Sequence, residues 1–297
     1  VYKRQMQELI YVPPGGTVAD LTGCVELKFQ EPYILSTLSG VSGLDYTLIS
    51  SEAAGVDGVV VQSVRAESRE IPCTVYVKGD SRQEMYRNRF GLIAKLTPQR
   101  EPGELHYRND YISVKIKAYP TLPADFTERV KNYSKCDVTF IAPEPYWEGL
   151  DTYSESIAYQ DDVGFEFPLC FEPDITFGVQ NNTIEIMYGG TVPAPVRITI
   201  SGEAPSPQIT NETTGETILV SDLSLESGDN LTIYTKCGEK SVKLHRGGVI
   251  SDAFHLLDMR SKFWQLQPGR NVITYKSADD NKHARVRIEY TNLYSGV

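Results

Sequence analysis

The side chains that could perform chemistry in this sequence are scattered rather than grouped. No Gly-x-Ser-x-Gly turn of a serine hydrolase, no phosphate-binding glycine loop and no His-x-x-x-His pair occurs in it. The four histidines lie far apart and away from any cysteine pair: His106, His245, His255 and His283. The sequence therefore predicts no catalytic residue, no cofactor and no metal site.

Three carboxylates, Glu166, Glu172 and Asp174, flank an apolar stretch and are the best candidates for a catalytic acid pair. Two such groups about 5–10 Å apart are sufficient for a glycosidase. However, this chain has 39 acidic residues, and clusters of this kind usually belong to a solvated face. We therefore predict that the protein is not an enzyme.

The cysteines also indicate a structural role. Their number is odd, and they are far apart in the sequence, with no Cys-x-x-Cys pair: Cys24, Cys73, Cys136, Cys170 and Cys237. Several lie within apolar, strand-like runs, where a free thiol behaves as a small hydrophobic group. We expect reduced core residues made in a reducing cytosol; metal ligands or disulfides are the alternative.

Length and charge limit the possible classes of protein. A chain of 297 residues is long enough for two domains with separate cores. No apolar run approaches the roughly 20 residues that span a bilayer, so we expect no membrane insertion. The net charge of -10 argues against nucleic-acid binding through basic clusters, so no sequence-specific nucleic-acid binding is expected.

Alternation of apolar and polar residues predicts a β-rich first domain. Short, half-buried strands are expected at residues 25–30, 59–62 and 73–77. A hairpin around Asn109-Asp110 is expected next, followed by a closing strand at residues 133–141. Turn pairs rich in glycine separate these runs.

One helix interrupts these strands. Ser81 followed by Glu84 is a capping box, so a helix is expected to begin there and to stop at Pro98. It should pack on one face of the sheet. Its predicted apolar stripe consists of Met85, Tyr86, Phe90, Leu92, Ile93 and Leu96.

The clearest signal for the end of a strand lies at the midpoint of the chain. Pro143 and Pro145 end the closing strand, because proline cannot donate a ladder hydrogen bond. Tyr146 and Trp147 follow and offer a large apolar surface with polar tips. We predict that these four residues form a structural hinge; a ligand-binding aromatic platform is the alternative.

Only strands are expected after a polar connector at residues 151–162. Their spacing favours a β-sandwich or jelly roll. The expected strands lie at residues 183–188, 196–201, 217–220, 231–235, 241–244, 271–275 and 284–290.

The order of motifs in the first half resembles a known family. The motifs are Gly43-Leu44-Asp45-Tyr46, Asp57-Gly58, an arginine-led strand, Leu96-Thr97-Pro98, Gly-Glu-Leu-His-Tyr at 103–107 and Pro-Tyr-Trp-Glu at 145–148. Together they are similar to the distal tail protein (Dit) family of siphophages. The last motif is the most specific of them.

The second half resembles the galectin-like C-terminal domain of the same family. The resemblance rests on residues 209–216, 227–233 and 263–271, and the ending Tyr294-Ser295-Gly296-Val297 is similar to family C-termini. Sugar-binding galectins cluster a His, an Asn, an Arg and a stacking Trp. Here His245-Arg246 runs into two glycines, and Trp264 lies beside a Leu-Gln-Pro-Gly turn, so Trp264 is expected in the core or an interface.

The resemblance implies a mainly β fold and a structural role in the virion. Residues 6–149 would be a β-sandwich or split-barrel-like, ring-forming tail-hub domain with one packed helix, and residues 150–297 a galectin-like β-sandwich. Residues 1–5 are expected to be a non-native extension before Met6.

In that family the protein is a homohexameric ring hub of the tail tip or baseplate. Its implied partners are the tail tube protein, a tail-associated hub or fibre protein and a receptor-binding protein. The alternative is a lectin-like protein that binds carbohydrate on the host surface.

Overall fold

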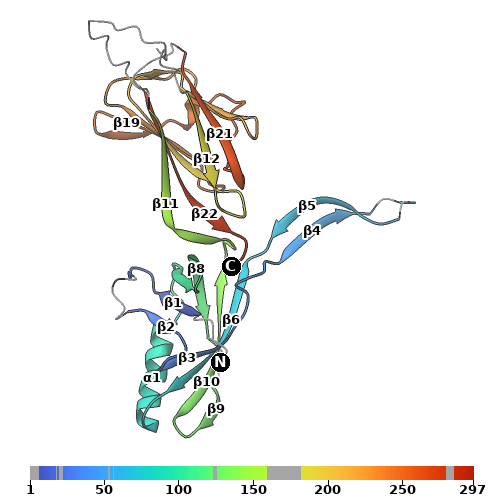
Figure 1. The fold of residues 1–297 in the computed structure, drawn as a ribbon, viewed down its shortest axis with the longest axis vertical. Coiled ribbons are helices and arrows are strands. Elements are labelled where there is room, and N and C mark those ends of the chain that lie inside the picture. The colour runs from blue at the N-terminus through green and yellow to red at the C-terminus, as the bar shows by residue number, and fades with distance from the viewer. Residues whose placement is uncertain are drawn as a thin grey trace, which may run out of the picture. The chain divides into compact units, whose positions relative to one another are not determined.

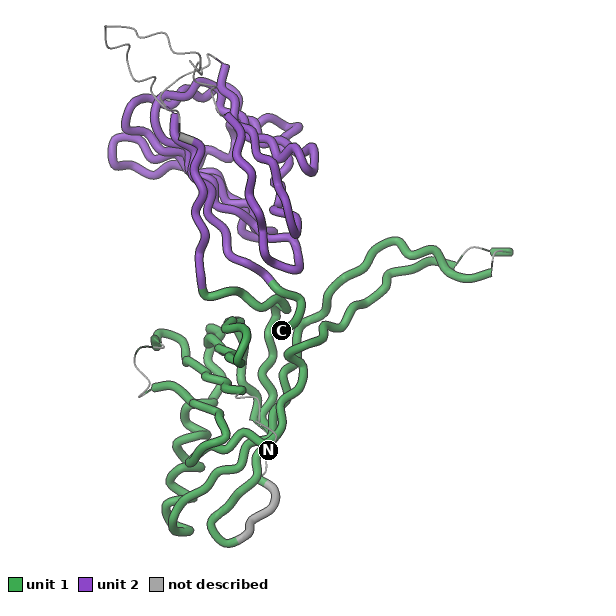
Figure 2. Tube along the Cα trace, in the orientation of Figure 1, with its two compact units in different colours: residues 1–150, 294–297 green, residues 151–293 purple. Residues whose placement is uncertain are grey.

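The computed structural model confirms a mainly β fold with one α-helix (Figure 1). It describes residues 7–17, 19, 23–52, 54–55, 57–122, 126–158, 182–278 and 284–297. The expected extension at residues 1–5 lies outside them, as do Glu166, Cys170, Glu172 and Asp174. The chain divides into two compact units, Val1–Leu150 with Tyr294–Val297, and Asp151–Leu293 (Figure 2).

Two antiparallel sheets form the first unit. One has the order β2-β1-β7-β8-β11, in which β11 (Trp147–Ala158) contributes its first residues to this unit. The other contains β3, β6, β10 and β9, and the sheets meet where β10 pairs with the end of β8. The strands are β1 (Glu8–Val12), β2 (Val25–Leu27), β3 (Tyr33–Leu38), β6 (Arg69–Lys78), β7 (Gly103–Arg108), β8 (Ser113–Thr121), β9 (Thr127–Val130) and β10 (Tyr133–Ala142).

The core of this unit lies between the sheets and helix α1 (Arg82–Lys95). The capping box is present, because the Ser81 hydroxyl accepts a hydrogen bond from the Glu84 amide at 3.1 Å. Leu92 and Leu96 are fully buried in this core. Phe90 was wrongly assigned to the apolar stripe: it is 71% exposed.

The two faces of α1 should differ sharply in their response to substitution. Met85 is buried, so Met85→Ala should lower the free energy of unfolding of the first unit by about 2–5 kcal/mol. Phe90→Ser should change it by less than about 0.5 kcal/mol, because that ring is already in solvent. Urea unfolding of the two variants checks this, and equal losses would contradict the packing described.

Strands β4 (Tyr46–Ser51) and β5 (Val60–Ala66) form a two-stranded sheet of their own. The hairpin projects from the first unit in Figure 1. The expectation of a half-buried strand at residues 59–62 is therefore wrong, since every residue of β4 and nearly every residue of β5 is exposed. A hairpin without a covering layer is marginally stable in water.

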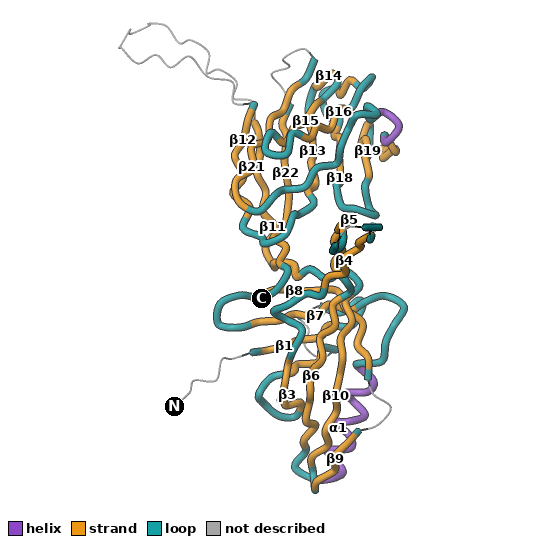
Figure 3. Tube along the Cα trace, turned by 90° about the vertical axis from the view of Figure 1, so that its right-hand side faces the viewer, coloured by secondary structure: helices purple, strands orange, loops and turns teal. Residues whose placement is uncertain are grey.

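The second unit is a sandwich of antiparallel strands (Figure 3). One sheet has the order β11-β22-β13-β18-β19-β20, the other β12-β21-β15-β16, and a two-stranded sheet pairs β14 with β17. The bounds are β12 (Thr183–Tyr188), β13 (Val196–Ser201), β14 (Ala204–Pro205), β15 (Gln208–Asn211), β16 (Glu216–Leu219), β17 (Ser224–Leu225), β18 (Asn230–Tyr234), β19 (Ser241–Arg246), β20 (Val249–Asp252), β21 (Gly269–Lys276) and β22 (Arg285–Tyr294), with a short 3-10 helix at Phe254–Leu256.

The predicted polar connector is largely a strand. β11 (Trp147–Ala158) begins in the first unit and continues into the second, so residues 151–158 are extended and paired. Their polar composition reflects exposure on both sides, as every residue from Leu150 to Ser156 is exposed.

Four cysteines are described, and none of them is in a disulfide. Cys24, Cys73 and Cys136 are buried as expected, and burial raises the pKa of Cys73 to about 12 and that of Cys136 to about 11. Such thiols are inert at neutral pH because the reactive thiolate is not populated. Cys237 is exposed, so its assignment to the core is wrong.

Candidate assembly site

A buried arginine organises one end of the first unit. Arg69 is the first residue of β6 and is only 2% exposed. Its guanidinium donates hydrogen bonds to five backbone carbonyls, those of Gly40, Val41, Gly43, Pro145 and Ser295. These carbonyls come from three segments that are far apart in the sequence.

The carbonyls replace the water that this cation loses. The Nε atom lies 2.7 Å from the Pro145 oxygen, and Nη1 lies 2.7 Å from the Gly43 oxygen. Burial lowers the pKa of Arg69, while the charges of Tyr46 and Asp45 act in the opposite direction. Arginine nonetheless remains protonated in proteins, so five oriented dipoles hold a permanent buried charge.

The five carbonyls form a cage around the Arg69 guanidinium, which we call the carbonyl cage. Trp147 closes its other side. Its indole is fully buried, and Nε1 donates to the Val41 carbonyl at 3.2 Å. The ring centroid lies 5.7 Å from Cζ of Arg69, within cation–π range, and 6.0 Å from the ring of Tyr107. The indole thus contacts both the cation and the core.

The four predicted hinge residues lie between β10 and the start of β11. Pro143 is exposed, Pro145 offers its carbonyl to Arg69, Tyr146 is half-buried and Trp147 is buried. Burial raises the pKa of the Tyr146 phenol. The segment is anchored at Pro145 and Trp147, while its role as a hinge stays a prediction.

The last four residues of the sequence complete the cage. The Val297 amide donates to the Val41 carbonyl at 3.1 Å, and the Ser42 hydroxyl donates to the Val297 carbonyl at 2.9 Å. A Cβ atom on Gly296 would lie 2.0 Å from the Ser42 carbonyl oxygen, so only glycine fits. Sequence reasoning missed this contact, because nothing local in the sequence pairs residues so far apart.

The caged segment leads directly into the hairpin. Gly40 has φ +77°, and a Cβ there would lie 2.0 Å from the Glu70 carbonyl oxygen, so its conformation and contacts both require glycine. Residues 40–43 are held by Arg69, Trp147 and the C-terminal residues, and β4 begins at Tyr46. The base of the hairpin is therefore fixed although its strands are exposed.

Three exposed apolar side chains lie together on one face of the hairpin. Leu48 and Val64 are directly opposite each other, and Tyr46 precedes Leu48 by two residues on the same face. Tyr46 is 50% exposed, Leu48 60% and Val64 59%. We call these three residues the apolar hairpin face. Clustered exposed apolar side chains of this kind mark interaction surfaces.

The second unit has no sugar-stacking platform at the positions considered in the sequence. Trp264 is fully buried in the core, which confirms its expected place. Arg246 forms an ion pair with Asp229 at 2.6 Å and donates to the Ser224 carbonyl at 2.8 Å. The hydrogen bond from Arg246 lowers the pKa of Asp229. Both side chains therefore hold neighbouring strands together.

One further group of titratable side chains is described, in which the Glu104 carboxylate accepts from Lys115 Nζ at 3.2 Å and lies 3.2 Å from Nε2 of His106. Among the residues that the structure describes, no three His, Cys, Asp or Glu side chains lie close enough to hold a metal ion. No described helix is long and apolar enough to cross a membrane.

Comparison with protein families gives two matches in chain order. Residues 24–142 match the phage tail protein RIFT-related domain, and residues 189–294 match the C-terminal domain of the siphovirus-type tail component. Together they cover more than half of the chain. No curated protein matches the sequence.

Solved structures share the fold. The Dit protein of phage SPP1, described as a paradigm of the hub adsorption apparatus in phages that infect Gram-positive bacteria, matches with a TM-score of 0.67 and 14% identity, over 97% of this chain and 98% of that one. A chain of the phage P2 baseplate in its activated, calcium-bound conformation matches with a TM-score of 0.51 and 12% identity, over 98% and 99%.

The two family matches and the two-unit β fold define a component of the phage tail or baseplate. Within that class, the chain belongs to the distal tail protein family of siphophages. Virion localisation follows from this membership.

Proposed function

We propose that this protein forms a homohexameric ring that acts as the structural hub of the tail tip. The observation that carries the proposal is the apolar hairpin face, which is exposed on a single chain and fixed at its base. Such a surface favours association, because burying each Leu or Val side chain stabilises a complex by about 1.5–3 kcal/mol. A contact between two different patches of identical chains closes into a ring when its rotation permits.

The position of the hub implies its partners. The first unit would stack on the tail tube protein and contact the tail-associated hub or fibre protein. The second unit would carry receptor-binding proteins at the periphery. The SPP1 protein, which is part of an adsorption hub, and the matching chain of the P2 baseplate support this assignment. Synthesis would take place in the host cytoplasm, and the role is structural rather than enzymatic.

Light scattering of the protein over a concentration series tests the ring. A hexamer should appear with six times the mass of the 33.2 kDa chain, either at all concentrations or in exchange with monomer. Monomers at every concentration would contradict self-assembly by the isolated protein.

A further inference from the structure

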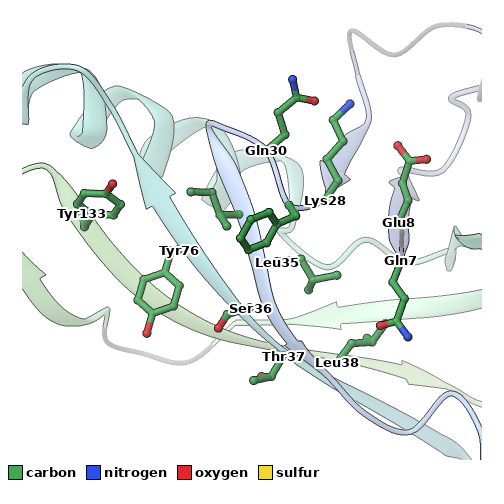
Figure 4. A pocket seen from close by; sticks show the side chains of 12 residues that line it. Gln7, Glu8, Lys28, Gln30, Leu35, Ser36, Thr37, Leu38, Tyr76 and Tyr133 are labelled. Carbon is green, nitrogen blue, oxygen red and sulfur yellow. The ribbon is translucent and has the colours of Figure 1, made fainter. Parts of the chain in front are cut away.

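A groove on the first unit has the properties of a binding site for the hairpin. It has a volume of about 1200 Å³ and runs along β3, with walls from β1, β6, β10 and the segment 28–30. Figure 4 shows Tyr76 and Tyr133 on one side of β3, and Lys28 and Glu8 on the other. Phe29, which also lines the groove, is 68% exposed.

We propose that this groove binds the β4–β5 hairpin of a second copy of the chain; this inference rests on the proposed ring. Among the described strands, β3 pairs only with β6. Its other edge is bridged at one point, where the Leu35 amide donates to the Lys28 carbonyl at 3.0 Å, and residues 34–38 line the groove. An edge strand is a natural place for a strand of another chain to add. The hairpin in turn pairs with no other described strand.

The groove offers exposed aromatic surface to an incoming strand. Phe29 is 68% exposed and Tyr133 38%, so a strand that covers them removes apolar area from water. Tyr46 of the incoming hairpin would add a further aromatic ring.

The charges permit this contact. The hairpin with its flanks, residues 45–67, carries four acidic residues and one arginine. The lysines beside the groove are Lys28, which pairs with Glu26, and Lys78, which pairs with Glu31 and lies over the Tyr133 ring at 5.6 Å. Glu8 also lines the groove. The rim is thus balanced rather than acidic and does not repel the hairpin.

A hairpin cannot readily enter the groove of its own chain. Residues 40–43, which precede it, are fixed by hydrogen bonds to Arg69 and Trp147. The hairpin strands are consequently exposed in the single chain. A contact from hairpin to groove therefore links different copies, and it is the heterologous kind that builds rings.

Mixing two complementary variants tests this pairing. In the first variant, residues 46–66 are replaced by a short Gly-Ser linker, so it keeps the groove but has no hairpin. The second variant carries Phe29→Asp, so it keeps the hairpin, while binding in its own groove should be about a hundredfold weaker. Each variant alone should be monomeric by light scattering, whereas an equimolar mixture should form a one-to-one dimer.

Phe90→Asp is the matched control, because Phe90 is similarly exposed at 71% but lies on α1, outside the groove. It should assemble as the unmodified chain does. Two results would contradict binding of the hairpin in the groove but not the ring. In both, the unmodified chain assembles, and either the mixture stays monomeric or Phe29→Asp assembles normally. A monomeric unmodified chain would contradict both the ring and the binding in the groove.

Discussion

Leu48→Asp combined with Val64→Asp should abolish self-association while both units remain folded. These side chains are directly opposite each other on the apolar hairpin face, and both are more than half exposed in the single chain. Losing two apolar contacts of about 1.5–3 kcal/mol each weakens an interface by a factor of about 10²–10⁴. Burying the new carboxylates would add to this loss. Light scattering should therefore show monomers.

Thr47→Asp combined with Ser63→Asp is the control for charge and strand propensity. Those residues lie on the other face of the same hairpin, since Thr47 is opposite Arg65 and Ser63 is opposite Ile49. They add the same two carboxylates without removing apolar area. Full assembly of this control beside a monomeric first variant would assign the contact to one face. Equal assembly of both would exclude the apolar hairpin face from the interface.

The hairpin shows how far the strand pattern of the sequence can be trusted. The pattern correctly predicted a strand near residues 59–62 but wrongly predicted a half-buried one. Alternation indicates that one face of a strand needs a cover, but it does not say whether that cover belongs to the same chain. Helical spacing has the same limit: it placed Phe90 on the apolar stripe of α1, but that side chain is exposed.

Long-range contacts are the part that the sequence did not predict. The motif at Pro145 and Trp147 was recognisable, but Arg69, which donates to the Pro145 carbonyl, lies 76 residues away from it in the sequence. The Ser295 carbonyl, to which Arg69 also donates, lies 226 residues from Arg69. Arg69 could be suspected only as a charged residue at the head of an apolar, alternating strand. The residues that fix the hairpin therefore became apparent only from the fold.

Arg69→Met should be among the most destabilising single substitutions in the first unit. It removes the guanidinium that donates to the Gly40, Gly43 and Pro145 carbonyls. An unpaired buried polar group costs about 1–3 kcal/mol, and partial relaxation makes the sum smaller than five such losses. We expect a loss of about 3–5 kcal/mol, a large share of the stability of an ordinary domain. Arg69→Lys should recover only part of it, because an ammonium group lacks the planar fork.

The two tryptophans allow this loss to be assigned to one unit. Trp147 lies in the core of the first unit and Trp264 in that of the second, and the chain has no others. In a Trp264→Phe background, urea unfolding followed by fluorescence reports the first unit alone. Arg87→Met, at an exposed position on α1, should change this transition by less than about 0.5 kcal/mol. An equally small change for Arg69→Met would show that the carbonyl cage contributes little.

The same substitution should also weaken assembly. Arg69 holds residues 40–43, from which the chain passes into β4, and the Ser295 carbonyl that brings in the C-terminal residues. A hairpin on a loosened base must be ordered when it binds, and that ordering opposes association. At a temperature where Arg69→Met is still folded, its assembly should therefore require a higher protein concentration than that of the parent chain. Unchanged assembly would mean that the hairpin is positioned by its own strands and not by the cage.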